Sequence, residues 1–387
     1  MKLQKTLKPG LRFIASILLH VFDSAVLLNR NARGRSAVIV RTDAIGDFIL
    51  WLPYAKKFCG ELRSRNERIV FVCNSVWADF ARSELPVEIF PVERSRFRSN
   101  LSYRFRILRS LARIGADRVY HPVLSRDSIV GDSIVHACGG YAYGFSGNAG
   151  NQSRAEEWLG NRSYSALLPA GAPLRHETAY HEMFLTWILK TAWAPEEKIS
   201  FPARKKTGAA YWVLVPGAGK KERRWPLDSF SRLIEKISRD FPDLRLKLLG
   251  SAPERNLCQK LLDASKIETE NLAGQTSLAQ MFEIIASASF FIGNESSGGH
   301  MAALLQVPSV CIVGGGHFGR FMPYTPERHV TRKPPAVASS EMACYGCNWQ
   351  CRFSPDPSGS APCVARITVE EVHSALGRTL SITDTTP

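Results

Sequence analysis

Hydrophobic and polar positions along this chain follow two alternating patterns that predict strands and helices in turn. Short apolar runs rich in β-branched residues, of the kind that a parallel sheet buries on both faces, alternate with stretches whose apolar residues recur at helical spacing. In the first half the pattern predicts strands at 37–41, 68–73, 87–92 and 118–121, with helices after Asp47, around 76–82 and over 101–114. Such an order predicts one Rossmann-like half of a doubly wound fold.

The second half of the chain repeats this alternation. A predicted helix at 176–189 leads into 195–207, which is rich in Pro, Lys and Arg and which we interpret as a linker. Beyond it the pattern predicts strands at 211–215, 245–249, 289–293 and 309–313, with helices at 227–240, 254–264, 277–286 and 299–306. The predicted class is therefore α/β, with Rossmann-like doubly wound domains at 36–194 and 208–343, and a Cys-rich segment with a final helix at 344–387.

Length and composition agree with two domains of ordinary size. The chain has 387 residues, of which 45% are hydrophobic and 22% charged, a balance typical of globular rather than disordered proteins. Lys and Arg number 50 against 35 Asp and Glu, which gives a net charge of +15. Residues 1–126 hold 23 basic and 10 acidic residues, so +13 of this excess lies in the first third and predicts an acidic partner there.

An acidic residue follows the first predicted strand. Asp47 closes a Gly-containing turn at the carboxyl end of that strand, which is where open α/β sheets place their ligands. We interpret Asp47 as a candidate catalytic base; the alternative is that it only caps the helix that follows. Asp43, in the same turn, is a possible substitute base, although we expect it to orient the loop.

Two later segments have the composition of anion-binding loops. Gly217 and Gly219 allow the backbone to approach a ligand closely, and four basic residues beside them, Lys220, Lys221, Arg223 and Arg224, can neutralise a diphosphate. Residues 294–300, Asn-Glu-Ser-Ser-Gly-Gly-His, follow a strand and open a helix, so their backbone N–H groups favour an anion. An ordinary surface loop is the alternative for the first segment.

These motifs together resemble a known family. The turn at Asp47, the segment 213–226 and the segments 271–280 and 290–310 match glycosyltransferase family 9, the lipopolysaccharide heptosyltransferases, in order and in spacing. The resemblance runs from Ala37 to the final helix, about nine tenths of the chain. It implies the GT-B architecture, in which two Rossmann-like domains face a central cleft. It also implies that the last helix, 369–380, packs back on the body, as in relatives where it returns to the first domain.

The resemblance assigns donor-binding roles to several residues. A basic residue two positions before Trp-Pro contacts the donor phosphate in the family; here that residue is Arg223, where relatives generally have Lys. Relatives usually have Asp-Ser-Gly-x-x-His, and here Glu295 and Ser297 replace the Asp and the Gly while Ser296 and His300 remain. A simple structural role is the alternative for His300, and a helix-terminus charge for Glu254, which otherwise holds the ribose. The implied donor site comprises Gly217, Lys220, Arg223, Glu254, Glu295, Ser296, Ser297, Gly298 and His300.

A basic cluster in the first half predicts contact with phosphate. Residues 94–118 contain eight arginines and a single acid, Asp117, and Arg suits forked contact with phosphate oxygens. We interpret the cluster as an acceptor or membrane surface; an ordinary basic face and nucleic acid are the alternatives, and no nucleic-acid-binding signature accompanies it. The predicted acceptor-binding residues are Arg41, Gly46, Arg94, Arg96 and Arg98.

Residues 1–35 resemble an appendage to the fold. Apolar residues at 11, 14, 18, 22 and 25 have helical spacing, which His20 and Asp23 interrupt, and the run has no charge-free stretch of the ~20 residues that spanning requires. Basic residues lie on both sides of it: Lys2, Lys5, Lys8, Arg12, Arg30, Arg33 and Arg35. We predict a basic amphipathic helix on an anionic membrane surface. A helix packed against the body of the protein and a signal peptide are the alternatives.

The nine cysteines fall into two groups. Cys59, Cys73, Cys138, Cys258 and Cys311 have the apolar contexts of buried thiols, which favours a reducing cytosol. Cys344, Cys347, Cys351 and Cys363 cluster in a Pro-, Ser- and Gly-rich stretch and could hold a structural Zn or Fe. Free thiols and disulfides are the alternatives.

The resemblance implies an inverting glycosyltransferase that moves a heptose from ADP-heptose to a lipopolysaccharide core or a related lipid-linked acceptor, with no catalytic metal. We expect it in the cytoplasm, peripheral on the inner face of the inner membrane. One alternative is a family member that uses another nucleotide sugar, for example one carrying N-acetylglucosamine. Another is a catalytically inactive sugar-nucleotide-binding scaffold. A nucleic-acid module built on the four clustered cysteines rests on charge and cysteines alone.

Overall fold

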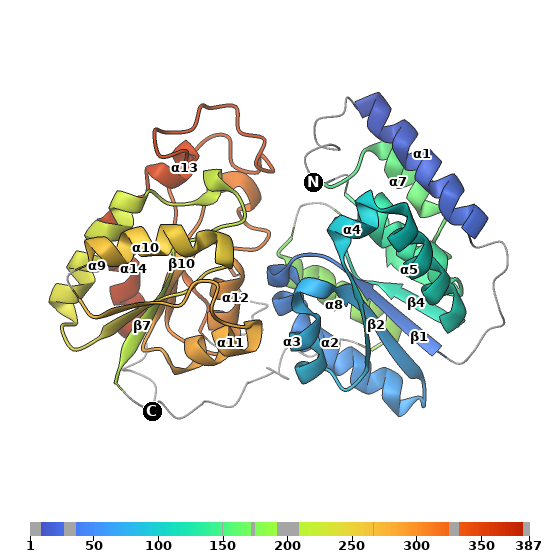
Figure 1. The fold of residues 1–387 in the computed structure, drawn as a ribbon, viewed down its shortest axis with the longest axis horizontal. Coiled ribbons are helices and arrows are strands. Elements are labelled where there is room, and N and C mark those ends of the chain that lie inside the picture. Colours follow the sequence, from blue (N-terminus) through green and yellow to red (C-terminus); the bar gives the residue numbers. More distant parts are fainter. Residues whose placement is uncertain are drawn as a thin grey trace. The chain divides into compact units, whose positions relative to one another are not determined.

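The computed structural model describes residues 9–26, 36–148, 150–171, 175–191, 209–265, 267–324 and 333–381. The chain divides into two compact units, residues 1–173 with 179–193, and residues 174–178 with 194–387 (Figure 1). The predicted linker at 195–207 lies outside the described residues, as do the basic residues predicted to flank the first helix, apart from the backbone of Arg12.

The first unit is built on a parallel six-stranded sheet with the order β3-β2-β1-β4-β5-β6. The strand β1 occupies the centre, where Val38 pairs with Val70 of β2 on one side and with Val119 of β4 on the other. The predicted strands are confirmed, and β5 and β6 are additions to them. The strands are β1 (Ser36–Arg41), β2 (Arg68–Asn74), β3 (Glu88–Val92), β4 (Arg118–His121), β5 (Tyr141–Phe145) and β6 (Ala166–Leu168).

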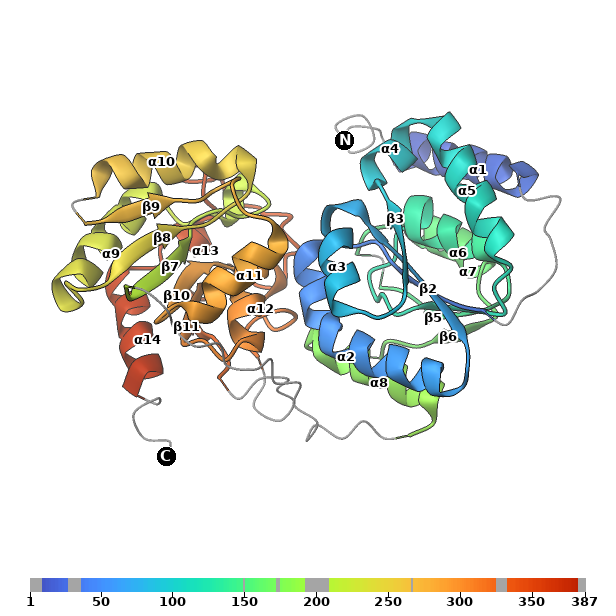
Figure 2. The same cartoon turned by 60° about the horizontal axis from the view of Figure 1, so that its bottom comes forward.

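Helices cover both faces of this sheet, with α2 and α8 on one side and α5 and α6 on the other (Figure 2). The helix α5 shows why its limits could be predicted: the Asn100 side chain caps its start, and Gly115 ends it in a left-handed conformation with φ of 63°. The helical segments are α1 (Pro9–Val26), α2 (Ile45–Ser64), η1 (Ser75–Trp77), α3 (Ala78–Glu84), α4 (Arg94–Ser99), α5 (Leu101–Ile114), the π-helix η2 (Ser128–Asp132), α6 (Ser133–Cys138), α7 (Arg154–Asn161) and α8 (Glu177–Leu189).

The second unit has a parallel six-stranded sheet with the order β12-β11-β10-β7-β8-β9. Read from β9, this is the third, second, first, fourth, fifth and sixth strand of the unit, the same order as in the first sheet. The strands are β7 (Tyr211–Val215), β8 (Arg245–Leu248), β9 (Thr269–Asn271), β10 (Phe291–Asn294), β11 (Ser309–Ile312) and β12 (Ala336–Ala338). Two Rossmann-like doubly wound sheets confirm the predicted fold class.

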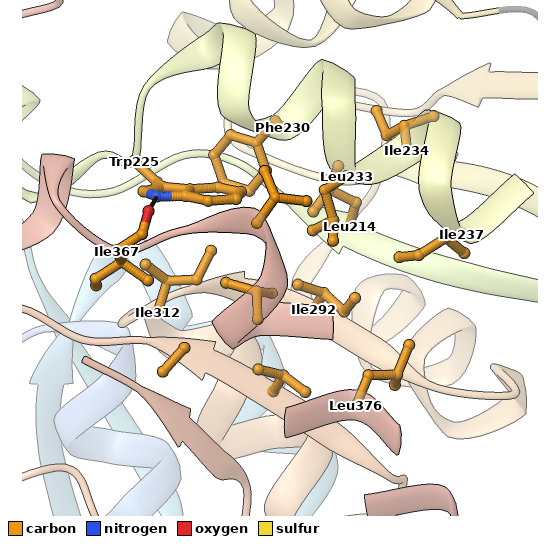
Figure 3. Packing of buried hydrophobic residues seen from close by; sticks show 14 of the residues in the cluster. Leu214, Trp225, Phe230, Leu233, Ile234, Ile237, Ile292, Ile312, Ile367 and Leu376 are labelled. Atoms are coloured by element: carbon orange, nitrogen blue, oxygen red, sulfur yellow. Dashed lines mark hydrogen bonds between the residues drawn. The ribbon is translucent and has the colours of Figure 1, made fainter. Parts of the chain in front are cut away.

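The core of the second unit joins its sheet to segments from both ends of the unit (Figure 3). Trp225 packs edge-on against Phe230, and its indole Nε1 donates a hydrogen bond to the Ile367 carbonyl over 2.8 Å. The helical segments are η3 (Lys221–Arg223), α9 (Leu227–Asp240), η4 (Ala252–Glu254), α10 (Arg255–Ala264), α11 (Leu278–Ser287), α12 (Ser297–Leu304), η5 (Gly315–His317), α13 (Pro362–Ala365) and α14 (Val369–Ser381).

The last helix, α14, corrects one expectation. It buries Val372, Ala375 and Leu376 in the core of the second unit, beside β11 and β12, rather than returning to the first. Its apolar face matches the sheet of its own unit, so packing there already covers it.

Among the helices that the structure describes, none has both the length and the apolar character to cross a bilayer.

Candidate functional site

Each sheet reverses its strand order at one point, between β1 and β4 in the first unit and between β7 and β10 in the second. The carboxyl edge of the strands at such a point is where doubly wound sheets bind ligands. The predicted base lies after β1. The first predicted phosphate loop follows β7 and the second follows β10. The topology therefore brings each group of candidates to the edge of a sheet that can hold a ligand.

Asp47 is the third residue of α2, in its first turn, and is partly exposed. The residue that flanks the helix is Ala44, which makes no side-chain cap. Asp47 is therefore not the N-cap, and it lies in the turn whose backbone N–H groups have no partner inside the helix. Gly46 is the second residue of the same helix. A partly exposed carboxylate at this edge has the chemistry of a proton acceptor, and the role predicted for Asp47 stays a prediction.

Arg41, predicted to bind an acceptor, is completely buried and holds the turn before Asp47 in place. Its Nε lies 3.0 Å from Asp43 Oδ2, and its Nη1 donates to the Pro122 carbonyl over 3.2 Å and to His181 Nε2 over 3.1 Å. The guanidinium lies over the Trp51 ring, 5.2 Å from its centroid. The ends of β1 and β4 are thus joined by one side chain. Asp43 is engaged by Arg41, which fits the orienting role expected for it.

The backbone of the same turn is fixed from the neighbouring strand. The Asp43 carbonyl accepts hydrogen bonds from Asn74 Nδ2 over 3.1 Å and from Trp77 Nε1 over 3.2 Å. The Trp77 ring also stacks on Phe48, with centroids 4.0 Å apart. The start of α2 is therefore rigidly placed on the sheet, which a positioned catalytic group requires.

The predicted arginine cluster is partly used inside the protein. Arg94 donates to Asp127 Oδ2 over 2.8 Å, and Arg98 contacts the same oxygen. Burial raises the pKa of the Asp127 carboxyl, but Arg98 and Arg94 outweigh burial and hold this pKa below its ordinary value. Arg96 is exposed and lies over the Tyr103 ring, 4.9 Å from its centroid. Of these three arginines, Arg96 presents its charge to solvent most fully.

In the second unit, Asn294 fastens the first phosphate loop to the second. Its Nδ2 donates to the Pro216 carbonyl over 2.7 Å, and its Oδ1 accepts from the Trp225 backbone N–H over 3.0 Å. Asn294 is fully buried at the end of β10. Both ends of the loop 216–225 are thereby held against the strand that precedes α12. The sequence did not indicate this role, because its partners lie 78 and 69 positions away.

Arg223 and Glu295, both predicted to bind the donor, meet at this edge. Arg223 Nη2 donates to the Glu295 carbonyl over 3.2 Å and lies 3.5 Å from Glu295 Oε1. Burial raises the pKa of the Glu295 carboxyl, while Arg223 acts to lower it. Within the described residues, three buried polar atoms here have no hydrogen-bond partner: Arg223 Nε, Glu295 Oε2 and Ser296 Oγ. Buried polar groups are normally paired, so this cluster is equipped to bind a polar ligand.

The helix α12 begins beside this cluster and packs tightly on the sheet. A Cβ at Gly298 would lie 2.9 Å from the Phe291 ring, and one at Gly299 would lie 2.4 Å from Cys311 Sγ. Ser296 flanks the helix without a side-chain cap, and Ser297 is its first residue. The first N–H groups of the helix therefore face the carboxyl edge without competition from a capping oxygen, as an anion-binding helix start requires.

His300 lies in the same helix and is buried. Its Nδ1 shares a hydrogen bond with the Tyr324 hydroxyl over 3.0 Å. Burial lowers the pKa of the imidazole to about 3, with further contributions from His176 and Arg223, so His300 is neutral at pH 7. A neutral imidazole can donate or accept a hydrogen bond but brings no charge to a phosphate.

Glu254 closes a capping box with Ser251 and also reaches the first phosphate loop. Its Oε2 accepts from the Ser251 backbone N–H over 2.8 Å, and a Cβ at Gly217 would lie 2.0 Å from its Oε1. Any side chain at position 217 would displace this carboxylate. Lys220 is exposed at the start of η3. Glu254 therefore has the helix-terminus role, and its carboxylate also lies close to Gly217, which is predicted to bind the donor.

The Cys-rich segment contacts the cluster at Arg223, which the sequence did not indicate. Trp349 lies over Arg223, with its ring centroid 5.1 Å from the guanidinium carbon. A Cβ at Gly316 would lie 2.4 Å from the Trp349 ring, and one at Gly315 would lie 2.1 Å from Tyr345. The run of three glycines at 314–316 is therefore needed to admit these two rings. That run is the one sequence signal that could have indicated the contact.

The four clustered cysteines lie near one another. Burial raises the pKa of the Cys363 thiol, the Gly315 N–H acts to lower it, and Cys344, Cys347 and Cys351 add to the increase. All nine cysteines are free, so the disulfide alternative is wrong in this structure. Among the described residues, no group of three or more His, Cys, Asp or Glu side chains is placed to hold a metal ion. The predicted Zn or Fe stays a prediction.

Comparison with known proteins relates the chain to one family. The model of glycosyltransferase family 9 (heptosyltransferase) matches residues 188–346. The lipooligosaccharide heptosyltransferase 2 of Campylobacter jejuni is 26% identical over 154 residues, 39% of this chain and 46% of the relative. The lipopolysaccharide heptosyltransferase 1 of Pseudomonas aeruginosa is 31% identical over 107 residues, 28% of this chain and 29% of the relative. The chain thus spans less than half the length of these curated relatives.

Solved structures share the fold over most of their length. The E. coli heptosyltransferase WaaC with ADP-2-deoxy-2-fluoro heptose has a TM-score of 0.63 and 16% identity, covering 89% of this chain and 99% of that one. The family 9 glycosyl transferase of Veillonella parvula has a TM-score of 0.66 and 14% identity, covering 91% and 100%. The E. coli ADP-heptose heptosyltransferase II has a TM-score of 0.56 and 16% identity, covering 90% and 100%. The two-sheet architecture is therefore that of these GT-B-like proteins.

Proposed function

We propose that this chain, which belongs to glycosyltransferase family 9, moves a heptose from ADP-heptose to a lipopolysaccharide core or a related lipid-linked acceptor, with inversion at the sugar carbon. The observation that carries the proposal is the cluster of Arg223, Glu295 and the start of α12 at the carboxyl edge of the second sheet. Two curated relatives are heptosyltransferases by name, and WaaC is described with an ADP-heptose analogue.

The second unit would bind and stabilise the leaving group. As the glycosidic bond breaks, negative charge develops on the departing nucleoside diphosphate. Arg223 and Lys220 would neutralise this charge, and the N–H groups at the start of α12 would donate to it. Trp349 and Glu295 hold the Arg223 guanidinium from two sides, so the cation is positioned before the donor binds. Preorganised charge of this kind costs no reorganisation during the reaction.

The first unit would activate the acceptor. A sugar hydroxyl is a weak nucleophile at neutral pH, so a base must take its proton as the new bond forms. Asp47 has the partial exposure and the fixed position at the sheet edge that this role requires. Arg96, exposed and basic, is suited to an anionic group of the acceptor. The division of labour assigns no step to a divalent metal. We propose the inner face of the inner membrane as the place of reaction.

A second candidate donor is a different nucleotide sugar, such as one carrying N-acetylglucosamine. The observation that favours it is Glu295, whose Oε2 has no partner among the described residues, at a position where heptosyltransferases usually have the shorter Asp. A carboxylate one methylene longer would meet another hydroxyl of the sugar. A catalytically inactive sugar-nucleotide-binding scaffold is the remaining alternative, and the presence of Asp47 argues against it.

The donor can be identified by thermal stabilisation, because a ligand that binds only the native state raises its stability by mass action. We expect ADP-heptose to raise the Tm of the purified protein more than UDP-N-acetylglucosamine or ADP alone does. Arg223→Ala should abolish the shift. The matched control is Arg239→Ala, since the Arg239 side chain is 77% exposed on α9 and lies outside the site. A larger shift with another nucleotide sugar would replace the proposed donor, and an unchanged shift in Arg223→Ala would remove Arg223 from the site.

A further inference from the structure

The first helix, α1, packs on the first unit with its polar side inward. Asp23 is fully buried and pairs with Arg104 of α5, whose Nε donates to Asp23 Oδ1 over 2.7 Å. Arg104 is fully buried as well and donates to the Ile129 carbonyl over 2.9 Å. Nearby, Ser16 Oγ donates to Glu156 Oε1 over 2.9 Å. Leu19 also packs against the core of this unit. Hydrogen bonds and an ion pair, together with this apolar contact, therefore fix which side of α1 faces the protein.

The opposite side of α1 exposes large apolar residues. Ile14 is 53% exposed, Ile17 38%, Leu18 64% and Val21 61%. Position 14 is three and four residues from 17 and 18, and these are four and three residues from 21, so the side chains form one continuous line, which we call the apolar stripe. A helix on a globular protein normally buries such a stripe and exposes its polar residues. Here these four apolar side chains face outward while Asp23 and Ser16 are buried, which indicates that the apolar stripe contacts something other than this unit.

An exposed Trp–Arg pair lies on α7 and the residue that follows it, and α7 contacts α1. Trp158 of α7 is 60% exposed, and the Arg162 guanidinium lies 3.4 Å from its ring centroid. The helices α1 and α7 are in contact, and they lie side by side in Figure 1. Arg162 is also close enough to His20 of α1 to contribute, after burial, to lowering the pKa of that imidazole. Trp and Arg are residue types that favour the headgroup region of a bilayer.

The helix α5, which packs beside α1, carries exposed basic residues. On α5, which also contacts α1, Arg106 and Arg113 are exposed, and Arg109 lies 5.9 Å from the centroid of the 46%-exposed Phe105 ring. The sequence adds seven basic residues within 1–35 and only one acid there, Asp23, whose charge is taken up by Arg104. A partner for this face must therefore accept apolar side chains and balance positive charge.

We propose that the apolar stripe of α1 docks on a lipid bilayer that carries anionic headgroups, with the helix lying in the plane of the interface. Apolar side chains enter the acyl boundary while the arginines of the neighbouring helices remain at the headgroups. A second copy of this chain is disfavoured as the occupant, because two such faces would bring like charges together. The inference does not rest on the proposed reaction, and lipid binding is measured without any substrate.

Vesicle co-sedimentation of the full chain tests the proposal. Phosphatidylcholine vesicles containing about a third phosphatidylglycerol should sediment the protein, and pure phosphatidylcholine vesicles should sediment at least about tenfold less, because the basic residues lose their counter-charges. Leu18→Glu with Val21→Glu should reduce binding to anionic vesicles at least about tenfold, since both charges would enter the acyl boundary. Val76→Glu is the matched control, because Val76 is 68% exposed on η1, away from α1, and this variant should sediment like the wild type.

Three results would overturn the proposal. The first is a wild-type protein that does not sediment with anionic vesicles. The second is a double variant that sediments as well as Val76→Glu does. The third is a wild-type dimer, detected by analytical ultracentrifugation without lipid, that Leu18→Glu with Val21→Glu converts to monomer while lipid binding is absent. In that case the apolar stripe is an interface between copies. Unchanged circular dichroism and Tm in both variants show that any loss of binding is not a loss of folding.

Discussion

Removing the Asp23 carboxylate should destabilise the first unit strongly. The Asp23 and Arg104 side chains are 0% and 1% exposed, so Asp23→Ala leaves a guanidinium buried without its counter-charge. Breaking a buried pair in this way costs about 3–5 kcal/mol. Arg104 keeps its bonds to the Ile129 carbonyl and to Ser133 Oγ, which favours the lower end of that range. For a unit of this size, such a loss lowers the Tm by roughly 6–20 °C.

Two comparisons separate this effect from others. Asp23→Leu combined with Arg104→Met replaces both charges by apolar groups, and it should lie within about 2 kcal/mol of the wild type because no uncompensated charge remains. Glu88→Ala breaks the exposed Arg68–Glu88 pair in the same unit, whose side chains are 57% and 49% exposed, and it should cost less than about 1 kcal/mol. Urea denaturation and thermal unfolding measure all three. If Asp23→Ala costs no more than Glu88→Ala does, the pair does not hold α1 in the described orientation.

Three further predictions concern the second unit. Trp349→Leu should raise the KM for the nucleotide sugar about 3- to 10-fold, because Arg223 loses the ring beneath it; an unchanged KM with a lowered Tm would leave Trp349 only a packing role. Burial lowers the pKa of His300 to about 3 from 6.5 in the unfolded chain, with His176 and Arg223 contributing, so the native state binds fewer protons between these values. Protonation of His300 should therefore lower the free energy of unfolding by about 2 kcal/mol between pH 7 and pH 5. His300→Gln should remove that share of the pH dependence in urea denaturation. An equally steep dependence in the variant would contradict the assignment to His300. The spacing of Cys344, Cys347, Cys351 and Cys363 predicts one Zn or Fe per chain by elemental analysis, lost in Cys347→Ser, whereas a metal content near zero would leave these residues as free thiols.

The regular elements of the fold could be predicted where local signals were complete. The helices α5 and α9 begin and end at the residues expected, and so do β4 and β7. The two helices have a clear apolar period, the two strands are short and largely buried runs, and α5 also has a capping Asn and a terminal Gly. By contrast, β6, β9 and β12 are three residues long, too short for any period to show. They are strands because a neighbouring strand pairs with them.

The site could be predicted only as far as its motifs reach. The motif brought Arg223 and Glu295 to one place, and they meet there across 72 positions of sequence. The sequence could not show that Asp127 pairs with Arg94 and Arg98, or that Trp349 lies over Arg223. Each contact joins segments that are far apart in the sequence and that no motif links. Asp23 is the clearest case. In the sequence it only interrupts the apolar spacing of α1, whereas in the structure it anchors the helix. The sequence could not show this role, because its partner Arg104 lies 81 positions away.

Transfer by the Asp47→Asn variant tests the central claim most directly. ADP release from ADP-heptose in the presence of a lipopolysaccharide-core acceptor gives the turnover number, and thermal stabilisation by ADP-heptose reports donor binding in the same samples. We predict that Asp47→Asn retains the wild-type thermal shift and loses at least about 100-fold in turnover, the usual contribution of a general base. Turnover within about twofold of the wild type would contradict the account.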